Sequence, residues 1–175
     1  MSELIERAAA FAKAAHKKID QRRKYTNEPY IVHPQAVAGL VESVTTDEVM
    51  IAAAWLHDVV EDTSVTIGDV EKAFGQEVAS LVDDLTDVAR PEDGNRAART
   101  AKNRDHTAAA DPRAKTVKLA DVIHNISDIA QANPGYAPKY IAEKEQLIEV
   151  LGEGDPALLK QANQTIAEVK EDLAK

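Results

Sequence analysis

Four side chains that commonly bind metal ions lie far apart in this sequence. They are His33, the adjacent pair His57 and Asp58, and Asp121. His57 and Asp58 interrupt the apolar run AAAWLHDVV, and Asp121 lies in a similar run, TVKLADVIHNI. Because a buried carboxylate is costly unless it is paired or bound to a cation, two acids in apolar runs favour a shared divalent ion. Two nitrogen and two oxygen donors, without sulfur, suit Mn, Fe, Co or Zn better than Ca or Mg.

Each of these residues taken alone has a simpler interpretation. A polar side chain on an apolar helix is often held by one local hydrogen bond, and a His-Asp dipeptide arises frequently by chance. The four residues together, each beside a helix end or on an apolar helix, favour a metal site over four unrelated polar contacts.

The carboxyl pair Glu61 and Asp62 provides candidate acid–base groups next to the metal residues. With helical spacing, both acids lie one turn from Asp58, at i,i+3 and i,i+4, and therefore on the same side of the helix. A carboxylate in that place can orient a water molecule that a metal has made more acidic and accept its proton. The alternative is that residues 61–64, Glu-Asp-Thr-Ser, only cap the following turn.

The elements that position these residues are predicted to be helices almost throughout. Alanine is abundant, while glycine and proline number seven each and aromatic residues make up 4%. This composition is typical of helical proteins. Capping signals mark helix starts at Thr46, at Thr66, at Asp111-Pro112 and at Asp155-Pro156. We predict an all-α fold, a bundle of about eight to nine helices, without strands or repeats.

Three segments of the chain have a distinct predicted character. Residues 20–34 cannot form one continuous helix, because Pro29 and Pro34 interrupt the pattern. Residues 96–110 are predicted to form a polar, alanine-rich helix with little apolar surface, and residues 155–175 to form the last helix. No linker divides the chain, so residues 1–175 are expected to be one domain.

The composition excludes several classes of function. The chain of 175 residues and 19.0 kDa has no cysteine, which excludes disulfide scaffolds, iron–sulfur clusters and thiol catalysis. Its net charge of −9 argues against broad binding to nucleic acid or anionic membranes. No apolar run approaches the ~18 residues of a membrane span, and the N-terminus lacks the features of a signal peptide. We expect a cytoplasmic protein that binds neither nucleic acid nor membranes.

The residues around the candidate ligands resemble a known family. EPYIVHP at 28–34, LHDVVEDT at 56–63, FGQEVASLVDDLTD at 74–87 and KLADVIHN at 118–125 resemble the hydrolase domain of RelA/SpoT-homologue proteins. That domain belongs to the HD-domain metal-dependent phosphohydrolases. The resemblance spans residues 8–151. The chain is too short to hold the synthetase and regulatory domains of long members, and it resembles most the stand-alone small alarmone hydrolases of the Mesh type.

This resemblance implies a reaction, a metal and a role for individual residues. The family removes the 3′-pyrophosphate of (p)ppGpp, which releases pyrophosphate and GDP or GTP, and the adenine equivalents are also candidate substrates. Its cofactor is Mn²⁺, one ion per chain. The implied metal ligands are His33, His57, Asp58 and Asp121, and the implied catalytic acids are Glu61 and Asp62.

A nucleotide substrate on a net-acidic protein requires local cations. Residues 13–24 and 96–104 are rich in lysine and arginine. The resemblance places a basic pair, a sugar-binding asparagine and a tyrosine near the nucleotide, and a lysine one turn before Asp121 can reach the same region. The residues expected to bind substrate are Arg23, Lys24, Lys118, Asn125, Arg96, Arg99, Arg104 and Tyr140.

The helix expected at 96–104 is a candidate lid. Its cations recur at helical spacing, so their mutual repulsion predicts a segment that becomes ordered when substrate phosphates neutralise it. For Tyr30 the sequence leaves open whether the side chain packs or contacts ligand. The histidines His16, His106 and His124 lack a complete ligand set, so a second metal is not expected.

Two other functions stay open at this point. One is a different HD phosphohydrolase activity, on another nucleotide or on NADPH. The other is a non-catalytic helical binding module, although such a homologue would be expected to lose a ligand or one of the two acids Glu61 and Asp62. The sequence does not decide between guanine and adenine, or between a monomer and a homodimer.

Overall fold

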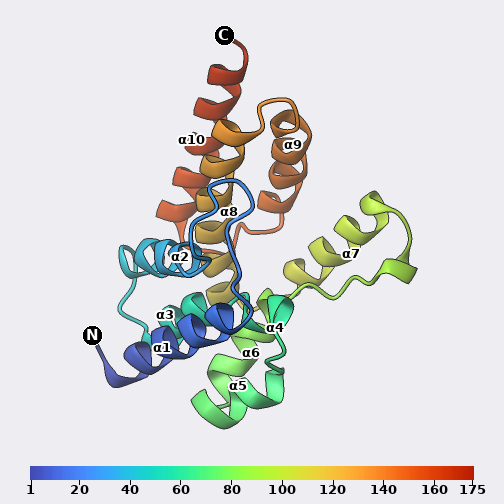
Figure 1. Ribbon diagram of the computed structural model, residues 1–175. Helices are drawn as coiled ribbons and strands as arrows, with labels where there is room; N and C mark the ends of the chain where they lie inside the picture. The colour runs from blue at the N-terminus through green and yellow to red at the C-terminus, as the bar shows by residue number, and fades with distance from the viewer.

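The computed structural model describes all 175 residues as an all-α structure (Figure 1). The helices are α1 (Glu3–Lys18), α2 (Val32–Glu42), α3 (Glu48–Leu56), α4 (Val59–Asp62), α5 (Ile67–Phe74), α6 (Gln76–Leu85), α7 (Arg96–Ala108), α8 (Pro112–Ala132), α9 (Ala137–Ile148) and α10 (Pro156–Leu173). A 3-10 turn, Pro91–Asp93, precedes α7. Nine helices have eight residues or more and α4 is a single turn, so the predicted fold class is confirmed.

The helix starts follow the capping signals with one exception. Asp111 and Asp155 cap α8 and α10, each with proline at the first helical position, and Thr66 forms a capping box at α5. The cap of α3 is Asp47, so the prediction of Thr46 is wrong by one residue. The Asp47 carboxylate accepts two backbone N–H groups of the first turn, and its negative charge favours the N-terminal end of the helix dipole.

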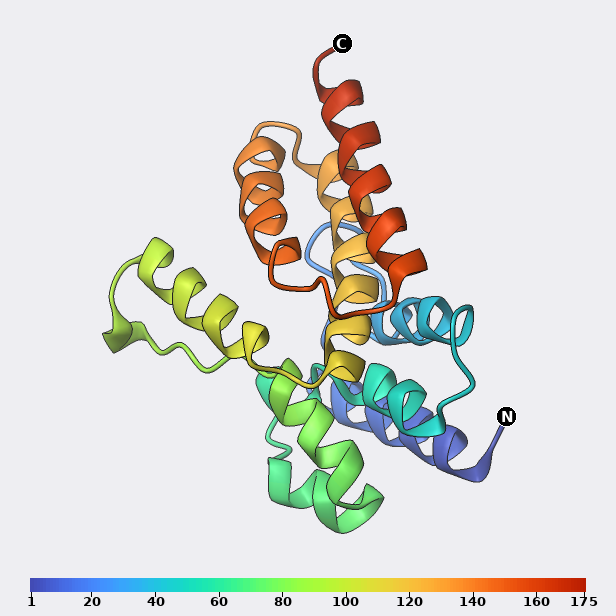
Figure 2. The ribbon, with the colours of Figure 1, turned by 180° about the vertical axis from the view of Figure 1, so that it is seen from behind.

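Helix α8 is the central element of the fold (Figures 1 and 2). It packs against α10, α2, α6, α3 and α9. Eleven of its 21 residues are buried, because its apolar positions face neighbours on several sides. A single cluster of 35 buried apolar residues runs from α1 to α10. A polar residue in the middle of α8 therefore lies deep in the molecule.

Helix α7 projects from this body as an arm (Figure 2). Only Thr107 of its thirteen residues is buried, as its polar sequence predicts. Side-chain contacts tie it to its surroundings: Asn103 Oδ1 accepts the backbone N–H groups of residues 88 and 89, and Arg96 pairs with Glu143 of α9. None of the ten helices combines the length and apolar character that a membrane crossing requires.

Candidate metal centre and substrate cleft

Three places in the fold bring the four candidate ligands together. His33 lies in the first turn of α2, His57 and Asp58 form the junction between α3 and α4, and Asp121 lies in the middle of α8. The two histidine residues are 1% exposed and Asp121 is 5% exposed. The convergence follows from the packing of α2 and α3 against α8.

The donor atoms of these side chains surround one point. His33 Nε2 lies 3.2 Å from His57 Nε2 and 3.0 Å from Asp121 Oδ1. Asp58 Oδ2 lies 3.0 Å from His57 Nε2 and 3.6 Å from His33 Nε2. His57 Nε2 also lies 3.6 Å from Asp121 Oδ1. Donor atoms of His33, His57 and Asp58 all lie within 4.8 Å of one another, and Asp121 approaches this group through the two imidazoles. The structure thus places the four residues where they could share an ion; their role as ligands stays a prediction.

The opposite side of each imidazole ring is also occupied. His57 Nδ1 donates to the carbonyl oxygen of Ala54 at 2.7 Å, so Nε2 is the nitrogen that faces the other candidate ligands. His33 Nδ1 lies 2.7 Å from Nδ1 of His124. Such contacts fix the tautomer and the orientation of metal-binding histidines. His124 therefore supports a candidate ligand, a contact that the sequence did not predict.

The two candidate carboxylate ligands are held by neighbouring side chains. The Tyr30 hydroxyl donates to Asp58 Oδ2 at 2.6 Å, and Tyr30 also lines a cavity at the loop after α1. Asn125 Nδ2 donates to Asp121 Oδ1 at 2.8 Å, and Lys118 Nζ lies 3.0 Å from Asp121 Oδ2. Lys118 and Asn125 share a face of α8 with Asp121 because they lie three and four residues away.

Buried charge in this cluster fits a divalent cation. Burial by itself would raise the pKa of Asp121. Lys118 and the two imidazoles lower it by a larger amount, so the pKa lies well below its usual range. Burial lowers the pKa of His57, and the charge of Asp58 outweighs this, so its pKa lies well above the ordinary value. The carboxylates of Asp58 and Asp121 are therefore stable only beside positive charge. A divalent ion bound to neutral imidazoles would supply that charge.

Glu61 and Asp62 end α4 on the side of Asp58, as their spacing predicts. Glu61 Oε1 accepts the backbone N–H of Asp87 at 2.9 Å, and Asp62 Oδ2 accepts from Gln21 Nε2 at 3.0 Å. Neither caps the next helix, whose N-cap is Thr66. The capping interpretation therefore does not account for the pair.

The surroundings of both acids raise their pKa values. Loss of hydration at the carboxyl group, together with the charges of Asp87 and Asp58, raises the pKa of Glu61 to about 7, although the residue as a whole is exposed. Burial also raises the pKa of Asp62, as does the charge of Asp58. A pKa near neutrality suits a group that exchanges protons with substrate or water.

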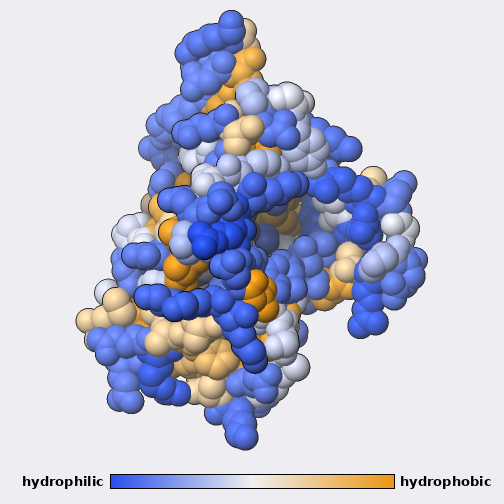
Figure 3. Space-filling model, in the orientation of Figure 1, coloured by the Kyte–Doolittle hydropathy of each residue, from blue (hydrophilic) through white to orange (hydrophobic).

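Two cavities adjoin the candidate metal centre. The first, of about 350 Å³, lies between α7, α8 and α9, and the second, of about 310 Å³, lies between α8 and the loop after α1. Lys118 lines the first and Asn125 the second, so each cavity has a residue that contacts Asp121. Figure 3 shows the recess between the α7 arm and the body, bordered by hydrophilic residues.

Every residue expected to bind substrate lines one of these cavities. The first holds Arg96, Arg99, Arg104 and Lys118, the second holds Arg23, Lys24 and Asn125, and Tyr140 lines both. The cavities also include Lys144 and Tyr25, which sequence reasoning missed. Lys144 follows Tyr140 by one helical turn, so its place on the same face of α9 was available from the sequence as a weak signal.

The cations of α7 are less isolated than their spacing suggested. Arg96 forms two hydrogen bonds of 2.8 Å with the Glu143 carboxylate, and Arg104 donates to Gln146 at 2.9 Å. Lys102 pairs with Asp93 of the 3-10 turn that precedes α7. Arg99 has no such partner. Mutual repulsion within α7 is therefore partly offset, and its ordering by substrate stays a prediction.

The chain can now be compared with known proteins. Residues 8–150, which contain every candidate site residue, match the family model described as an HD domain. The chain belongs to the HD-domain family. A guanosine-3′,5′-bis(diphosphate) 3′-pyrophosphohydrolase, MESH1, from Xenopus tropicalis is 38% identical over 147 residues, which cover 80% of this chain and 78% of that protein. The resemblance inferred from the sequence is confirmed.

Two further similarities differ in how much of the relative they cover. A probable guanosine-3′,5′-bis(diphosphate) 3′-pyrophosphohydrolase from Synechocystis is 42% identical over 134 residues. The match covers 75% of this chain but 17% of that longer protein. A solved structure of a metazoan orthologue of SpoT, described as hydrolysing ppGpp, is 30% identical with a TM-score of 0.85 and is covered over 96% of both chains. The small relatives thus match the whole fold.

Proposed function

We propose that this HD-domain protein hydrolyses the 3′-pyrophosphate of (p)ppGpp-type alarmones and releases pyrophosphate with GDP or GTP, or the adenine equivalents. One observation carries the proposal: two imidazoles and two carboxylates, buried or nearly so, converge beside the carboxyl pair Glu61 and Asp62, and their contacts Lys118 and Asn125 line two cavities. The activities ascribed to the MESH1 relative and the metazoan SpoT orthologue support it.

We propose that His33, His57, Asp58 and Asp121 hold a single Mn²⁺ ion. Their donor set of nitrogen and oxygen without sulfur fits this ion, and the buried negative charge requires a cation. When bound, the ion supplies Lewis-acid polarisation of a phosphoryl oxygen and makes a water molecule more acidic. Metal analysis of the purified protein, with Mn²⁺, Zn²⁺ and Mg²⁺ compared for activity, tests the identity of the ion.

Glu61 and Asp62 would handle the protons of the reaction. A water oxygen attacks the phosphorus next to the 3′ oxygen, the bond between that phosphorus and the 3′ oxygen breaks, and the ribose oxygen takes a proton. Asp62 would accept the proton of the water. Glu61, whose pKa is about 7, can hold a proton near neutral pH and return it to the leaving oxygen.

The two cavities suit different parts of a nucleotide. The cavity at α7 offers Arg99, Arg104, Lys118 and Lys144 to phosphate groups. The cavity at the loop after α1 offers three tyrosine rings and the amide of Asn125, a surface that suits a nucleoside. This arrangement supports an extended nucleotide whose 3′ group lies at the metal centre, with the base on one side and charged groups on the other.

Product analysis on the whole protein tests the proposal. Mn²⁺-loaded protein would be incubated with ppGpp, ppApp, NADPH and simple nucleotides, and the products identified. We expect pyrophosphate and GDP from ppGpp, with no turnover after chelation or in the double variant Glu61→Gln, Asp62→Asn. Release of inorganic phosphate from NADPH alone would favour another HD phosphohydrolase activity. Absence of turnover with every compound would favour the binding module.

The proposed substrate also bears on where the protein acts and on what it binds. We propose a cytoplasmic location, because the nucleotide substrate belongs to that compartment. A small anionic ligand, rather than nucleic acid, suits a chain of net charge −9 whose substrate-binding cations line two cavities. The homodimer stays a prediction, which sedimentation of the purified protein would test.

A further inference from the structure

A buried histidine outside both cavities contacts the candidate catalytic acid through one glutamine. His16, in the last turn of α1, is 1% exposed, and its Nδ1 lies 2.7 Å from Gln21 Oε1. Gln21 Nε2 in turn lies 3.0 Å from Asp62 Oδ2. His16 lines neither of the two cavities assigned to substrate and faces a separate one, of about 280 Å³. It does not touch the proposed substrate.

The chemistry of the three groups fixes the direction of these hydrogen bonds. An ionised Asp62 carboxylate only accepts, so the amide nitrogen of Gln21 must face it. The amide oxygen then faces His16, and His16 Nδ1 must donate to it. His16 Nε2 has no partner, which fits the unprotonated nitrogen of a neutral ring. The result is a one-way chain from His16 through Gln21 to Asp62.

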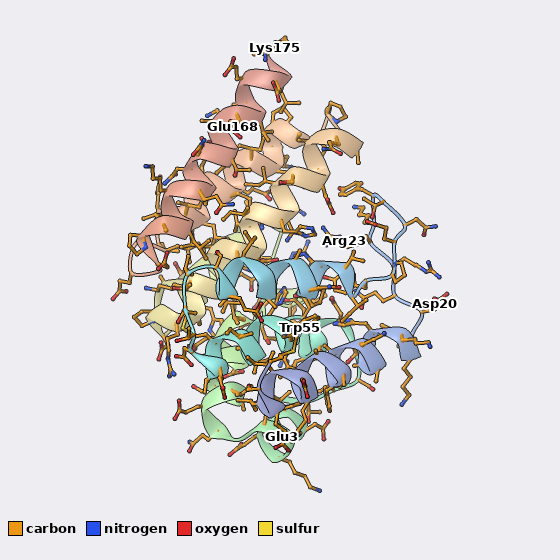
Figure 4. All side chains as sticks on the ribbon, turned by 90° about the vertical axis from the view of Figure 1, so that its left-hand side faces the viewer. Glu3, Asp20, Arg23, Trp55, Glu168 and Lys175 are labelled. Atoms are coloured by element: carbon orange, nitrogen blue, oxygen red, sulfur yellow. The ribbon has the colours of Figure 1, made fainter.

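The backbone holds Gln21 in place for this contact. Asp20, at the end of α1, has a φ of 47°, a left-handed conformation that turns the chain back toward the helix. Gln21 N–H then donates to the carbonyl of His16, and the Gln21 carbonyl accepts from the N–H of Tyr30. Figure 4 shows Asp20 at the end of α1 and Arg23 on the loop that leaves it.

Asp62 needs an anchor of this kind because its own helix offers little support. Helix α4 is a single turn in which only Val59 is buried. The His16 ring also packs 4.8 Å from the ring of Tyr30, whose hydroxyl holds Asp58. Contacts from the α1 side thus reach both acids at the two ends of α4.

We propose that His16 and Gln21 are positioning residues that hold the Asp62 carboxylate in the orientation in which it accepts a proton from water. The proposal rests on the proposed function. It assigns no substrate contact to His16. Gln21 also lines the cavity at the loop after α1, so its positioning role is read from kcat rather than from KM. The proposal gives a role to a buried histidine with a single hydrogen bond, at a place where an aliphatic side chain would leave no unpaired nitrogen.

Two substitutions of His16 separate positioning from packing. His16→Phe keeps a flat ring but removes the donor, whereas His16→Asn places an amide N–H close to the position of Nδ1. We expect His16→Phe to lower kcat for ppGpp about 10- to 100-fold, with KM and Mn²⁺ content nearly unchanged. His16→Asn should recover most of this loss. Gln21→Met, similar in size to glutamine, should reproduce the His16→Phe effect.

A double variant and a measurement without turnover complete the test. In an Asp62→Ala background, His16→Phe should lower kcat no further, because the orientation it controls no longer matters. Full kcat in His16→Phe or Gln21→Met, or multiplied losses in the double variant, would overturn the proposal. Nitrogen NMR should show His16 protonated at Nδ1, with this signal moved by Gln21→Met; a proton at Nε2 alone would overturn it even if ppGpp proved not to be the substrate.

Discussion

Replacement of Asp121 by alanine should remove the metal and destabilise the protein for a separate reason. Lys118 Nζ lies 3.0 Å from Asp121 Oδ2, and the two side chains are 17% and 7% exposed. Removing one partner of a buried ion pair leaves the other charge uncompensated, which costs about 3–5 kcal/mol. For a chain of this size each kcal/mol lowers Tm by about 2–4 °C, so Asp121→Ala should lower Tm by roughly 6–20 °C.

A second substitution separates the two effects. In Asp121→Ala with Lys118→Met, the uncompensated ammonium is gone, so most of the lost stability should return while the metal stays absent. Calorimetry of the metal-free proteins gives the stability, and elemental analysis of the Mn²⁺-loaded proteins gives the metal content. Stoichiometric metal in Asp121→Ala would remove Asp121 from the ligand set. Equal Tm for the single and double variants would refute the argument from the ion pair.

The remaining predictions concern pH, substrate binding and packing. The pKa of Glu61 is raised to about 7 in the folded protein, so ionisation of this carboxyl group above pH 7 favours the unfolded state. Glu61→Gln should therefore raise the Tm of the metal-free protein more at pH 8 than at pH 5. An equal rise in Tm at both pH values would contradict this. Arg23→Ala should raise KM while the metal stays bound, whereas Lys18→Ala, at an exposed residue that lines neither substrate cavity, should change neither. Gly154→Ala should cost about 1–3 kcal/mol of unfolding free energy, since its Cβ would lie 2.8 Å from a leucine methyl group. Gly152→Ala, with open space around it, is the control in the same denaturant titration, and equal midpoints for the two would refute the packing argument.

Three of the four candidate ligands, His57, Asp58 and Asp121, were predictable because they interrupt apolar helical runs. A carboxylate such as Asp121 in an apolar helical run requires a special reason, and the sequence displays both the run and the exception. Helix starts were predictable for the same local reason, since Asp followed by proline satisfies the first turn within a few residues. The error at Thr46 shows the limit of such signals where two capping residues are adjacent and only the local backbone decides.

The supporting contacts were not predictable because they join distant segments. The Tyr30 hydroxyl reaches Asp58 across 28 residues, and His124 reaches His33 across 91. The sequence separation of such pairs follows no helical or strand period, so it does not indicate a contact. Tyrosine and histidine residues also occur in many structural roles, so their type alone does not indicate one either. The partner of Arg96, Glu143, lies 47 residues away on α9, which is why the cations of α7 were expected to be less compensated than they are.

The site therefore combines a rigid half and a half that depends on side-chain contacts. Helix α8, packed on several sides, carries Lys118, Asp121 and Asn125 on one face, so their relative positions follow from the helix itself. The single turn α4 carries both candidate catalytic acids and starts beside Asp58, and hydrogen bonds from other segments hold all three. Proton transfer depends on the orientation of these carboxylates, whereas metal binding draws on both halves. Loss of an anchor of Glu61 or Asp62 should therefore lower kcat more than it lowers metal affinity.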